Sequence, residues 1–134
     1  MATEVRPRDW PRGAGYAHAY AAEGKFLFVA GQIGWDALTR TLVEGGLVAQ
    51  TRRALENIGT VLSAAGAETS DLVRLTWFVT DREAYMRERS AIGVAYRDVI
   101  GRHFPAMSVI FVAGLIEPGA LVEIEATAVL GSDP

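Results

Sequence analysis

The sequence contains no cysteine, which excludes a disulfide scaffold, a zinc–thiolate centre and a cysteine nucleophile. It also lacks a run of about 18 apolar residues, the length that a transmembrane helix needs. Arg6, Arg8 and Arg12 near the N-terminus have no apolar segment behind them, so we expect no signal peptide. Without an export signal, the expected location is the cytoplasm, and no membrane partner is expected.

The sequence has no excess of positive charge. Lysine and arginine total 13 against 16 aspartates and glutamates, a formal charge of −3, which argues against a nucleic-acid partner. The two histidines, His18 and His103, lack the short spacing typical of metal ligands, and structural roles are favoured for both. The glycines form neither a P-loop nor a G-x-G-x-x-G pattern. We therefore predict no metal site and no nucleotide-binding loop.

Hydrophobic residues are abundant. They make up 50% of the 134 residues, and the mean hydropathy is +0.17. This length corresponds to one domain, residues 1–134. Because a chain of this size buries only about two thirds of its surface, some apolar side chains are expected outside, and self-association is expected with them.

The order of elements predicts an α+β fold. Residues 1–15 are expected to form an irregular leader and residues 131–134 a polar tail. Helices are predicted at residues 47–65 and 84–100, where apolar side chains recur at three- and four-residue spacing, and Thr80 with Glu83 matches a capping box before the second. A hairpin is expected from the first two of five predicted strands, at residues 16–22, 25–30, 72–79, 107–112 and 121–130. The order β-β-α-β-α-β-β places two helices on one face of a single sheet.

The last predicted strand shows what covers the other face. Val122, Ile124 and Ala126 alternate with Glu123, Glu125 and Thr127. The apolar set belongs under the helices, whereas the second set is mixed, so a partner subunit is the simplest cover for it.

Glu123 and Glu125 are the first candidates for chemistry, since carboxylates two residues apart on a strand point the same way. At a partly buried seam such a group can serve as acid or base, but the pair also fits a solvated surface. Gly31 fits either a turn or a backbone amide that faces a ligand. Tyr16 and Trp35 could line a pocket, although aromatic residues in strands more often belong to a core or an interface.

Several segments together resemble one family. They are residues 15–19 (GYAHA), 27–33 (LFVAGQI), 54–58 (ALENI), 104–108 (FPAMS) and 122–126 (VEIEA). In this order they resemble the RidA/YjgF family of reactive-intermediate deaminases, from about Gly15 to Leu130.

The resemblance implies a chorismate-mutase-like fold, assembled as a homotrimer with active clefts between subunits. It also implies hydrolysis of small-molecule 2-imino acids, or of the enamines that precede them, to 2-keto acids and ammonia, with no metal or organic cofactor. Tyr16 matches the family's tyrosine near the cleft and Gly31 the glycine whose backbone meets the ligand. Glu123 matches the glutamate that positions or activates water.

The family's carboxylate-anchoring arginine, in a Pro-Ala-Arg-Ser pattern, is replaced by Met107. The family's cysteine corresponds to Val109, and the asparagine of the second helix to Gly93. A guanidinium binds a carboxylate through two charge-assisted hydrogen bonds, which a thioether cannot supply. Met107 is therefore expected to make the substrate-binding pocket softer and more apolar.

Two hypotheses follow. The first is a deaminase for an enamine or imine other than the standard 2-imino acid, with Glu123 catalytic and Trp35 stacking on a conjugated substrate. The alternative is a non-catalytic trimer that binds a small metabolite or a protein partner. RNA cleavage, attributed to some relatives, has little support from the charge balance. The sequence leaves open the roles of Glu117 and Glu125 and the cation, if any, that replaces the arginine.

Overall fold

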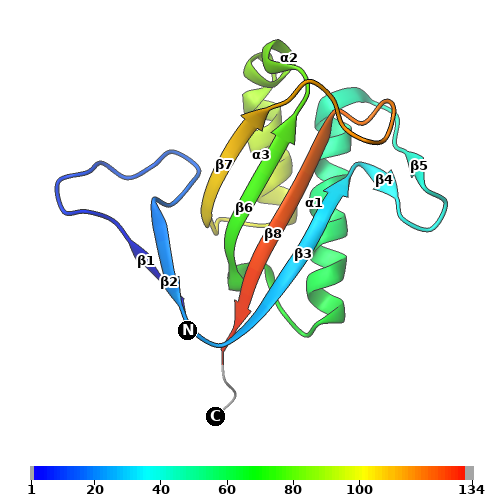
Figure 1. The fold of residues 1–134 in the computed structure, drawn as a ribbon. Helices are drawn as coiled ribbons and strands as arrows, with labels where there is room; N and C mark the ends of the chain where they lie inside the picture. The colour runs from blue at the N-terminus through cyan, green and yellow to red at the C-terminus, as the bar shows by residue number, and fades with distance from the viewer. Residues whose placement is uncertain (1, 132–134) are drawn as a thin grey trace.

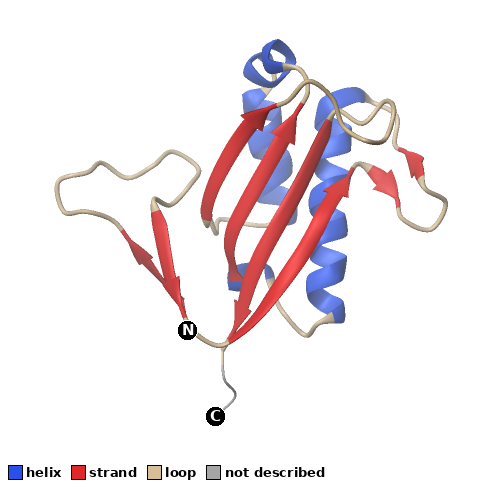
Figure 2. Ribbon diagram, in the orientation of Figure 1, coloured by secondary structure: helices blue, strands red, loops and turns tan. Residues whose placement is uncertain are grey.

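The computed structural model describes residues 2–131, which contain one mixed sheet with helices on one side (Figures 1 and 2). The sheet has the strand order β3–β8–β6–β7; β8 is antiparallel to both neighbours, and β6 and β7 are parallel. Its strands are β3 (Lys25–Ile33), β6 (Leu72–Val79), β7 (Ala106–Phe111) and β8 (Val122–Leu130). Behind it lie α1 (Gly46–Ala64), α2 (Arg82–Arg87) and α3 (Arg89–Val99). The predicted α+β fold with helices on one face is confirmed.

The predicted hairpin between residues 16–22 and 25–30 is wrong. β2 (Ala19–Ala22) instead pairs with β1 (Ala2–Val5), which lies in the stretch expected to be an irregular leader. β3 pairs with β8, so the chain leaves β2 and changes direction at Gly24. Glycine is required there because φ is +143° and the Leu130 carbonyl leaves no room for a side chain. The β1–β2 arm projects beside the sheet (Figure 1), and one backbone bridge between Ala17 and Ala106 joins the adjoining segment to β7.

Four local features also differ from the prediction. A short pair, β4 (Trp35–Asp36) and β5 (Thr41–Leu42), lies in a region expected to be a loop. The second helix is divided at Glu88 into α2 and α3. Its N-cap is Asp81 rather than Thr80, because the Asp81 carboxylate accepts the Ala84 amide at 3.0 Å. A short 3₁₀ helix, Thr69–Asp71, precedes β6.

The hydrophobic core lies between the sheet and the helices. Val122, Ile124 and Ala126 of β8, which the alternation places under the helices, are buried, and so is Ala128, whereas Leu130 at the end of the same alternation is only partly buried. Leu55, Ile58 and Leu62 supply the buried stripe of α1. Gly66, with φ +76°, follows the end of α1, and Gly101, with φ +93°, follows the end of α3.

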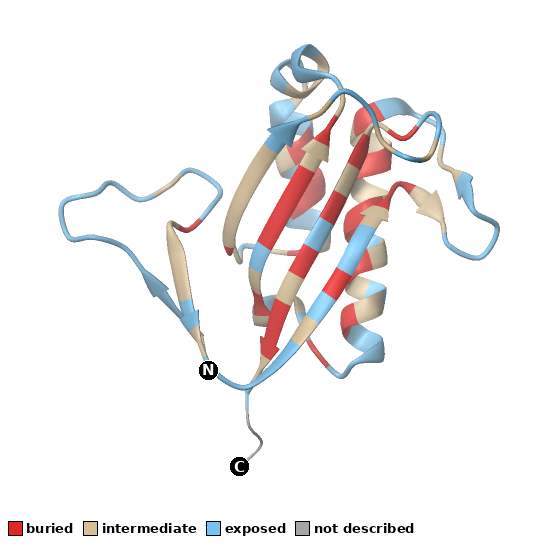
Figure 3. Ribbon diagram, viewed as in Figure 1, coloured by how far each residue is buried: buried red, intermediate tan, exposed pale blue. Residues whose placement is uncertain are grey.

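The other face of the sheet is open. Phe28 is 74% exposed, Phe26 51% and Ile110 43%, and β3 and β8 each include exposed residues (Figure 3). The rings of Phe26 and Phe28 lie 6.0 Å apart. We call these three residues the open-face apolar set. Ile110 lies on β7, at the other edge of the sheet, so the set spans this face. Large exposed apolar side chains gathered on one face usually mark an interface.

No helix within residues 2–131 is long and apolar enough to cross a membrane. Of the predicted tail, residues 131–134, only Gly131 lies in the described part of the chain.

Candidate functional site

Three of the predicted site residues meet in one cavity at the end of β3 and the beginning of β8. Gly31, Trp35 and Glu123 line it, together with Ile116 and Glu117 from the loop that precedes β8. Its volume is about 260 Å³. We call it the Glu123 cavity. The sequence left the role of Glu117 open, and the structure places this residue in the lining of the same cavity as Glu123.

Gly31 and Glu123 are in direct contact. A Cβ built on Gly31 would overlap Oε2 of Glu123 and lie 2.7 Å from its carboxyl carbon. The contact arises at a bulge, because the pairing of β3 with β8 passes from Val29–Ala126 directly to Gln32–Ile124. The absent side chain thus leaves the space in which the carboxylate lies.

Two polar side chains of α1 hold the surrounding segments. Gln50 donates to the Gly119 carbonyl at 3.0 Å and accepts the Leu121 amide at 2.8 Å, which fixes the end of the loop carrying Glu117. Asn57 donates to the carbonyls of Ile33 at 3.2 Å and Trp35 at 2.9 Å. Sequence reasoning missed both residues. The available signal was a polar side chain, Gln50, close to the apolar stripe of a helix; it is 5% exposed.

Met107 lies elsewhere. In the sheet it is level with Leu75, on the helix-covered face, whereas Glu123 is level with Phe78 on the opposite face. Met107 lines a second cavity of about 350 Å³, which we call the α3 cavity. Its lining comes from α2, α3, β6, β7 and two connecting segments: Ala14, Gly15, Trp77, Tyr85, Arg89, Ile92, Gly93, Tyr96, Arg97, Phe104, Met107 and Val109.

Tyr16 belongs to neither of these two linings, although its neighbour Gly15 reaches the α3 cavity. Tyr16 is 39% exposed, and its ring lies edge-on to His18 at 5.3 Å. Within one chain, the five predicted site residues are therefore divided into Gly31, Trp35 and Glu123 on one side, Met107 on another, and Tyr16 apart from both.

The wall of the α3 cavity is aromatic. Tyr96 stacks on Phe104 with ring centroids 5.3 Å apart and on Trp77 at 6.4 Å. The Tyr96 hydroxyl donates to the His103 carbonyl at 2.6 Å. Burial raises the pKa of Tyr96, so this hydroxyl is a neutral structural donor. The aromatic part of the lining is therefore uncharged.

The histidines have structural partners, as the sequence favours. Nε2 of His18 donates to the Pro11 carbonyl at 3.2 Å, and Nε2 of His103 donates to the Leu72 carbonyl at 2.7 Å. Glu125 is exposed on the open face, opposite Thr76, and does not line the Glu123 cavity. Within residues 2–131, no three His, Cys, Asp or Glu side chains gather as metal ligands.

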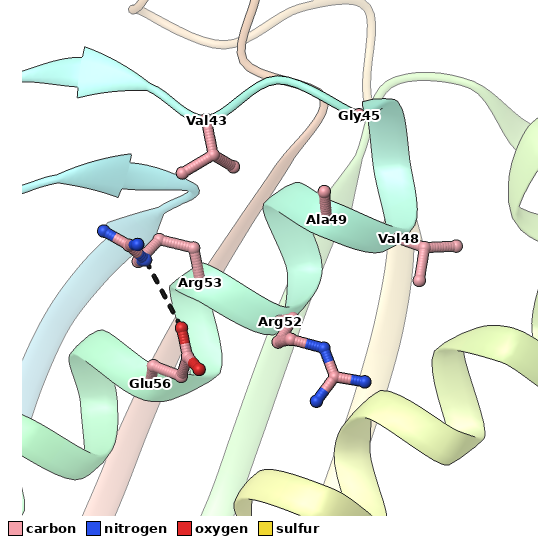
Figure 4. A pocket seen from close by; sticks show the side chains of 7 residues that line it. All are labelled: Val43, Gly45, Val48, Ala49, Arg52, Arg53 and Glu56. Carbon is pink, nitrogen blue, oxygen red and sulfur yellow. Dashed lines mark ion pairs between the residues drawn. The ribbon is translucent and has the colours of Figure 1, made fainter.

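A larger hollow, of about 560 Å³, lies beside α1 (Figure 4). It contains Arg52 and Arg53, but both are paired with carboxylates: Arg52 with Asp98 at 3.0 Å and Arg53 with Glu56 at 3.3 Å. None of the predicted site residues lines it. Size alone therefore does not identify the functional site.

The sheet and its backing helices define a small α+β protein with an acidic cavity on one side and an aromatic cavity on the other. The family model described as Endoribonuclease L-PSP matches residues 9–130. A goat protein named 2-iminobutanoate/2-iminopropanoate deaminase is 37% identical over 105 residues, which are 78% of this chain and 73% of the goat protein. Protein DfrA of Myxococcus xanthus is 38% identical over 125 residues, 89% of this chain and 88% of its own.

Among solved structures, YyfB of Yersinia pestis, described as a member of the conserved Rid protein family of unknown function, superimposes with a TM-score of 0.85. It is 35% identical and covers 96% of this chain and 98% of its own. The chain therefore belongs to the Endoribonuclease L-PSP family, with relatives in the RidA/YjgF group, as the resemblance of its segments predicts.

Proposed function

We propose that this protein hydrolyses a small reactive enamine or imine to the carbonyl compound and ammonia. The observation that carries the proposal is the contact between Glu123 and Gly31, which leaves a carboxylate at a small cavity. The proposal is supported by membership of a family in which relatives 32–37% identical to this chain are named 2-iminobutanoate/2-iminopropanoate deaminase.

The chemistry needs one group that moves protons. Water adds to the imine carbon, and Glu123 takes a proton from that water as the carbon–oxygen bond forms. Glu123 passes this proton to the imine nitrogen, which gives the neutral carbinolamine. Glu123 then takes the hydroxyl proton of the carbinolamine as the carbon–nitrogen bond breaks, and passes it to the departing nitrogen. Imine and water thus become carbonyl compound and ammonia, and the carboxylate is regenerated. An enamine first tautomerises to the imine, a proton transfer that the same carboxylate can assist.

A site that uses both cavities requires more than one copy of the chain. Glu123 and Met107 lie on opposite faces of the sheet, and β8 and β7 are separated by β6. We propose a homotrimer in which the open-face apolar set is covered by neighbouring copies and the two cavities of adjacent copies form one cleft. Exposed phenylalanines on this face support that arrangement, because large apolar patches are costly in water.

Met107 argues against 2-imino acids that are bound through a guanidinium on β7. It lines the α3 cavity from β7, where a strand-borne guanidinium would otherwise hold the carboxylate of a 2-imino acid. We propose a larger or differently anchored substrate, with a conjugated body that stacks on Trp35 or on the aromatic wall.

The test is a panel of freshly generated imines and enamines, followed by ammonia release. Acceleration of at least one conjugated enamine, and weak activity on 2-iminopropanoate, are expected. No acceleration across the panel would favour the alternative, a non-catalytic trimer that binds a small metabolite. In that panel, Met107→Arg should raise activity on 2-iminopropanoate if the remaining machinery is intact.

A further inference from the structure

We propose that the α3 cavity is an anion-binding subsite in which Arg97, assisted by Arg89, provides the positive charge that β7 lacks. Its ligand is a carboxylate attached to a flat apolar or conjugated body. The inference rests on the proposed function in one respect: the carboxylate would belong to the enamine or imine substrate. Neither arginine is singled out by the sequence, because neither lies near Met107 along the chain.

Gly93 leaves space for the Arg97 guanidinium. A Cβ built on Gly93 would lie 3.3 Å from Nη1 of Arg97, closer than most side-chain contacts. Arg97 is one turn after Gly93 on α3, and both residues line the cavity together with Met107. The absent side chain at residue 93 therefore makes room for the guanidinium of Arg97. In this way α3 supplies the positive charge that β7 lacks.

The two guanidinium groups are free to bind an anion. Among residues 2–131, neither Arg89 nor Arg97 has a carboxylate oxygen within 4.0 Å. The contrast is the hollow beside α1, where Arg53 is paired with Glu56 (Figure 4) and Arg52 with Asp98. An unpaired guanidinium beside a partly apolar pocket is the group that best holds a carboxylate, because it donates two parallel hydrogen bonds.

Trp77, a residue of the same lining, carries a second unpaired donor in the described chain. Trp77 is 4% exposed and lines the cavity, and its indole N–H has no hydrogen-bond partner in the described chain. A buried N–H without an acceptor is costly, and such groups in native proteins call for a partner. An oxygen of a bound anion would satisfy it.

The other lining residues determine which uncharged group, attached to the carboxylate, fits the α3 cavity. Tyr96, Phe104 and Met107 give a flat, polarizable surface with no charge. Arg89 lies close enough to Tyr85 that its charge opposes the effect of burial, which raises the pKa of that hydroxyl. The cavity thus combines cations on α3 with an aromatic floor, which suits an aromatic or conjugated carboxylate better than a short aliphatic one.

The experiment compares benzoate with neutral benzyl alcohol, using nitrogen-15 NMR of the full-length protein. Benzoate is expected to bind roughly tenfold or more tightly than benzyl alcohol and to shift the Trp77 indole and Arg97 Nε resonances. Arg97→Gln should remove most of that preference and leave benzyl alcohol binding unchanged. Arg87→Gln is the matched control, because Arg87 is an exposed arginine at the end of α2 that does not line the cavity. Equal binding of benzoate and benzyl alcohol, or full benzoate affinity in Arg89→Gln/Arg97→Gln, would overturn the inference.

A rescue variant tests the location. Met107→Arg in the Arg97→Gln background returns a guanidinium to the same cavity from β7, and benzoate affinity should recover. Absence of recovery in a protein with an unchanged unfolding midpoint contradicts placing the anion between α3 and β7. These measurements need no turnover. If the protein releases ammonia but does not bind benzoate selectively, the proposed deaminase activity stands and the anion subsite is wrong. If it binds benzoate selectively but converts no member of the panel, the subsite stands and the deaminase activity is wrong.

Discussion

The carboxylate of Glu123 lies where a side chain on residue 31 would have to be. A Cβ at Gly31 would meet Oε2, the carboxyl carbon and Cγ of Glu123, while the backbone around Gly31 has no positive φ. Glycine is thus required here by a close approach and not by backbone conformation. The relationship joins two residues that are 92 positions apart and connects the β3 bulge with the candidate catalytic group.

Gly31→Ala should reduce turnover without unfolding the protein. The atoms in the way belong to the end of a flexible side chain, so the carboxylate is expected to rotate aside, at a cost to the free energy of unfolding of about 1 kcal/mol or less. Activity should fall at least about tenfold, because a displaced general base loses its alignment with water. Steady-state ammonia release and urea unfolding measure the two effects.

Gly59→Ala is the matched control. Apart from its chain neighbours and the backbone of α1 itself, no atom lies within 4 Å of a Cβ at that position, and alanine favours a helix over glycine by about 1 kcal/mol. This variant should be more stable and equally active. Full activity of the Gly31→Ala protein would show that turnover does not depend on the contact between residue 31 and Glu123.

Gln50→Leu is expected to destabilise the protein and loosen the loop beside the Glu123 cavity. It leaves the Gly119 carbonyl and the Leu121 amide without their partner, at a cost of about 1–3 kcal/mol in the free energy of unfolding. Gln50→Glu keeps the acceptor for Leu121 but places a buried carboxylate against the Gly119 carbonyl, so it should lose at least as much. Urea denaturation measures both losses, and equal stability of both variants with the parent protein would show that the loop is held by other contacts.

The free energy of unfolding should fall as the pH rises above about 10. Burial raises the pKa of Tyr96, so the unfolded chain loses this proton first. The contribution of Tyr96 to the free energy of unfolding is fully present below the pKa that this hydroxyl has in the unfolded chain. It is lost as the pH rises from that value toward the pKa in the folded protein, by up to about 1.4 kcal/mol per pH unit. Tyr96→Phe should show a shallower decline between pH 10 and 11.5. An identical slope in both proteins would assign the decline to other groups.

Phe28→Glu should disrupt self-association. The side chain is 74% exposed on the open face, so a charge there costs a single chain little but is unfavourable in a covered interface. Light scattering should report a trimer for the parent protein and a smaller species for the variant. Val94→Glu, at an exposed apolar position on α3 behind the sheet, should remain trimeric. A monomeric parent protein at micromolar concentration would remove the proposed assembly.

The sequence predicted the large elements because their periodicity reports burial directly. The alternation of β8 places Val122 and Ile124 under the helices, and the stripe of α1 does the same for Leu55 and Ile58. The pairing of strands was harder to predict from the sequence. Residues 16–22 and 25–30 look like a hairpin, yet β3 pairs with β8, about 100 residues later, because this pairing covers Val29 with α1. Long-range pairing leaves no local signal.

The candidate site was predictable only in part. The family resemblance indicated Glu123 and Gly31 but not Arg97, whose relevance depends on the empty space at Gly93 and on how α3 lies over β7. Nor could it show that Glu123 and Met107 face opposite sides of the sheet. Both facts follow from tertiary packing, which composition and spacing do not encode.

The most direct test of the account is ammonia release by Glu123→Gln on whichever enamine or imine the parent protein converts. The amide has nearly the same shape but cannot take a proton from water, so turnover should fall by about a hundredfold or more while the trimer persists. Glu125→Gln, an exposed glutamate two residues further along β8, is the matched control and should retain full activity. Undiminished ammonia release by Glu123→Gln would contradict the account.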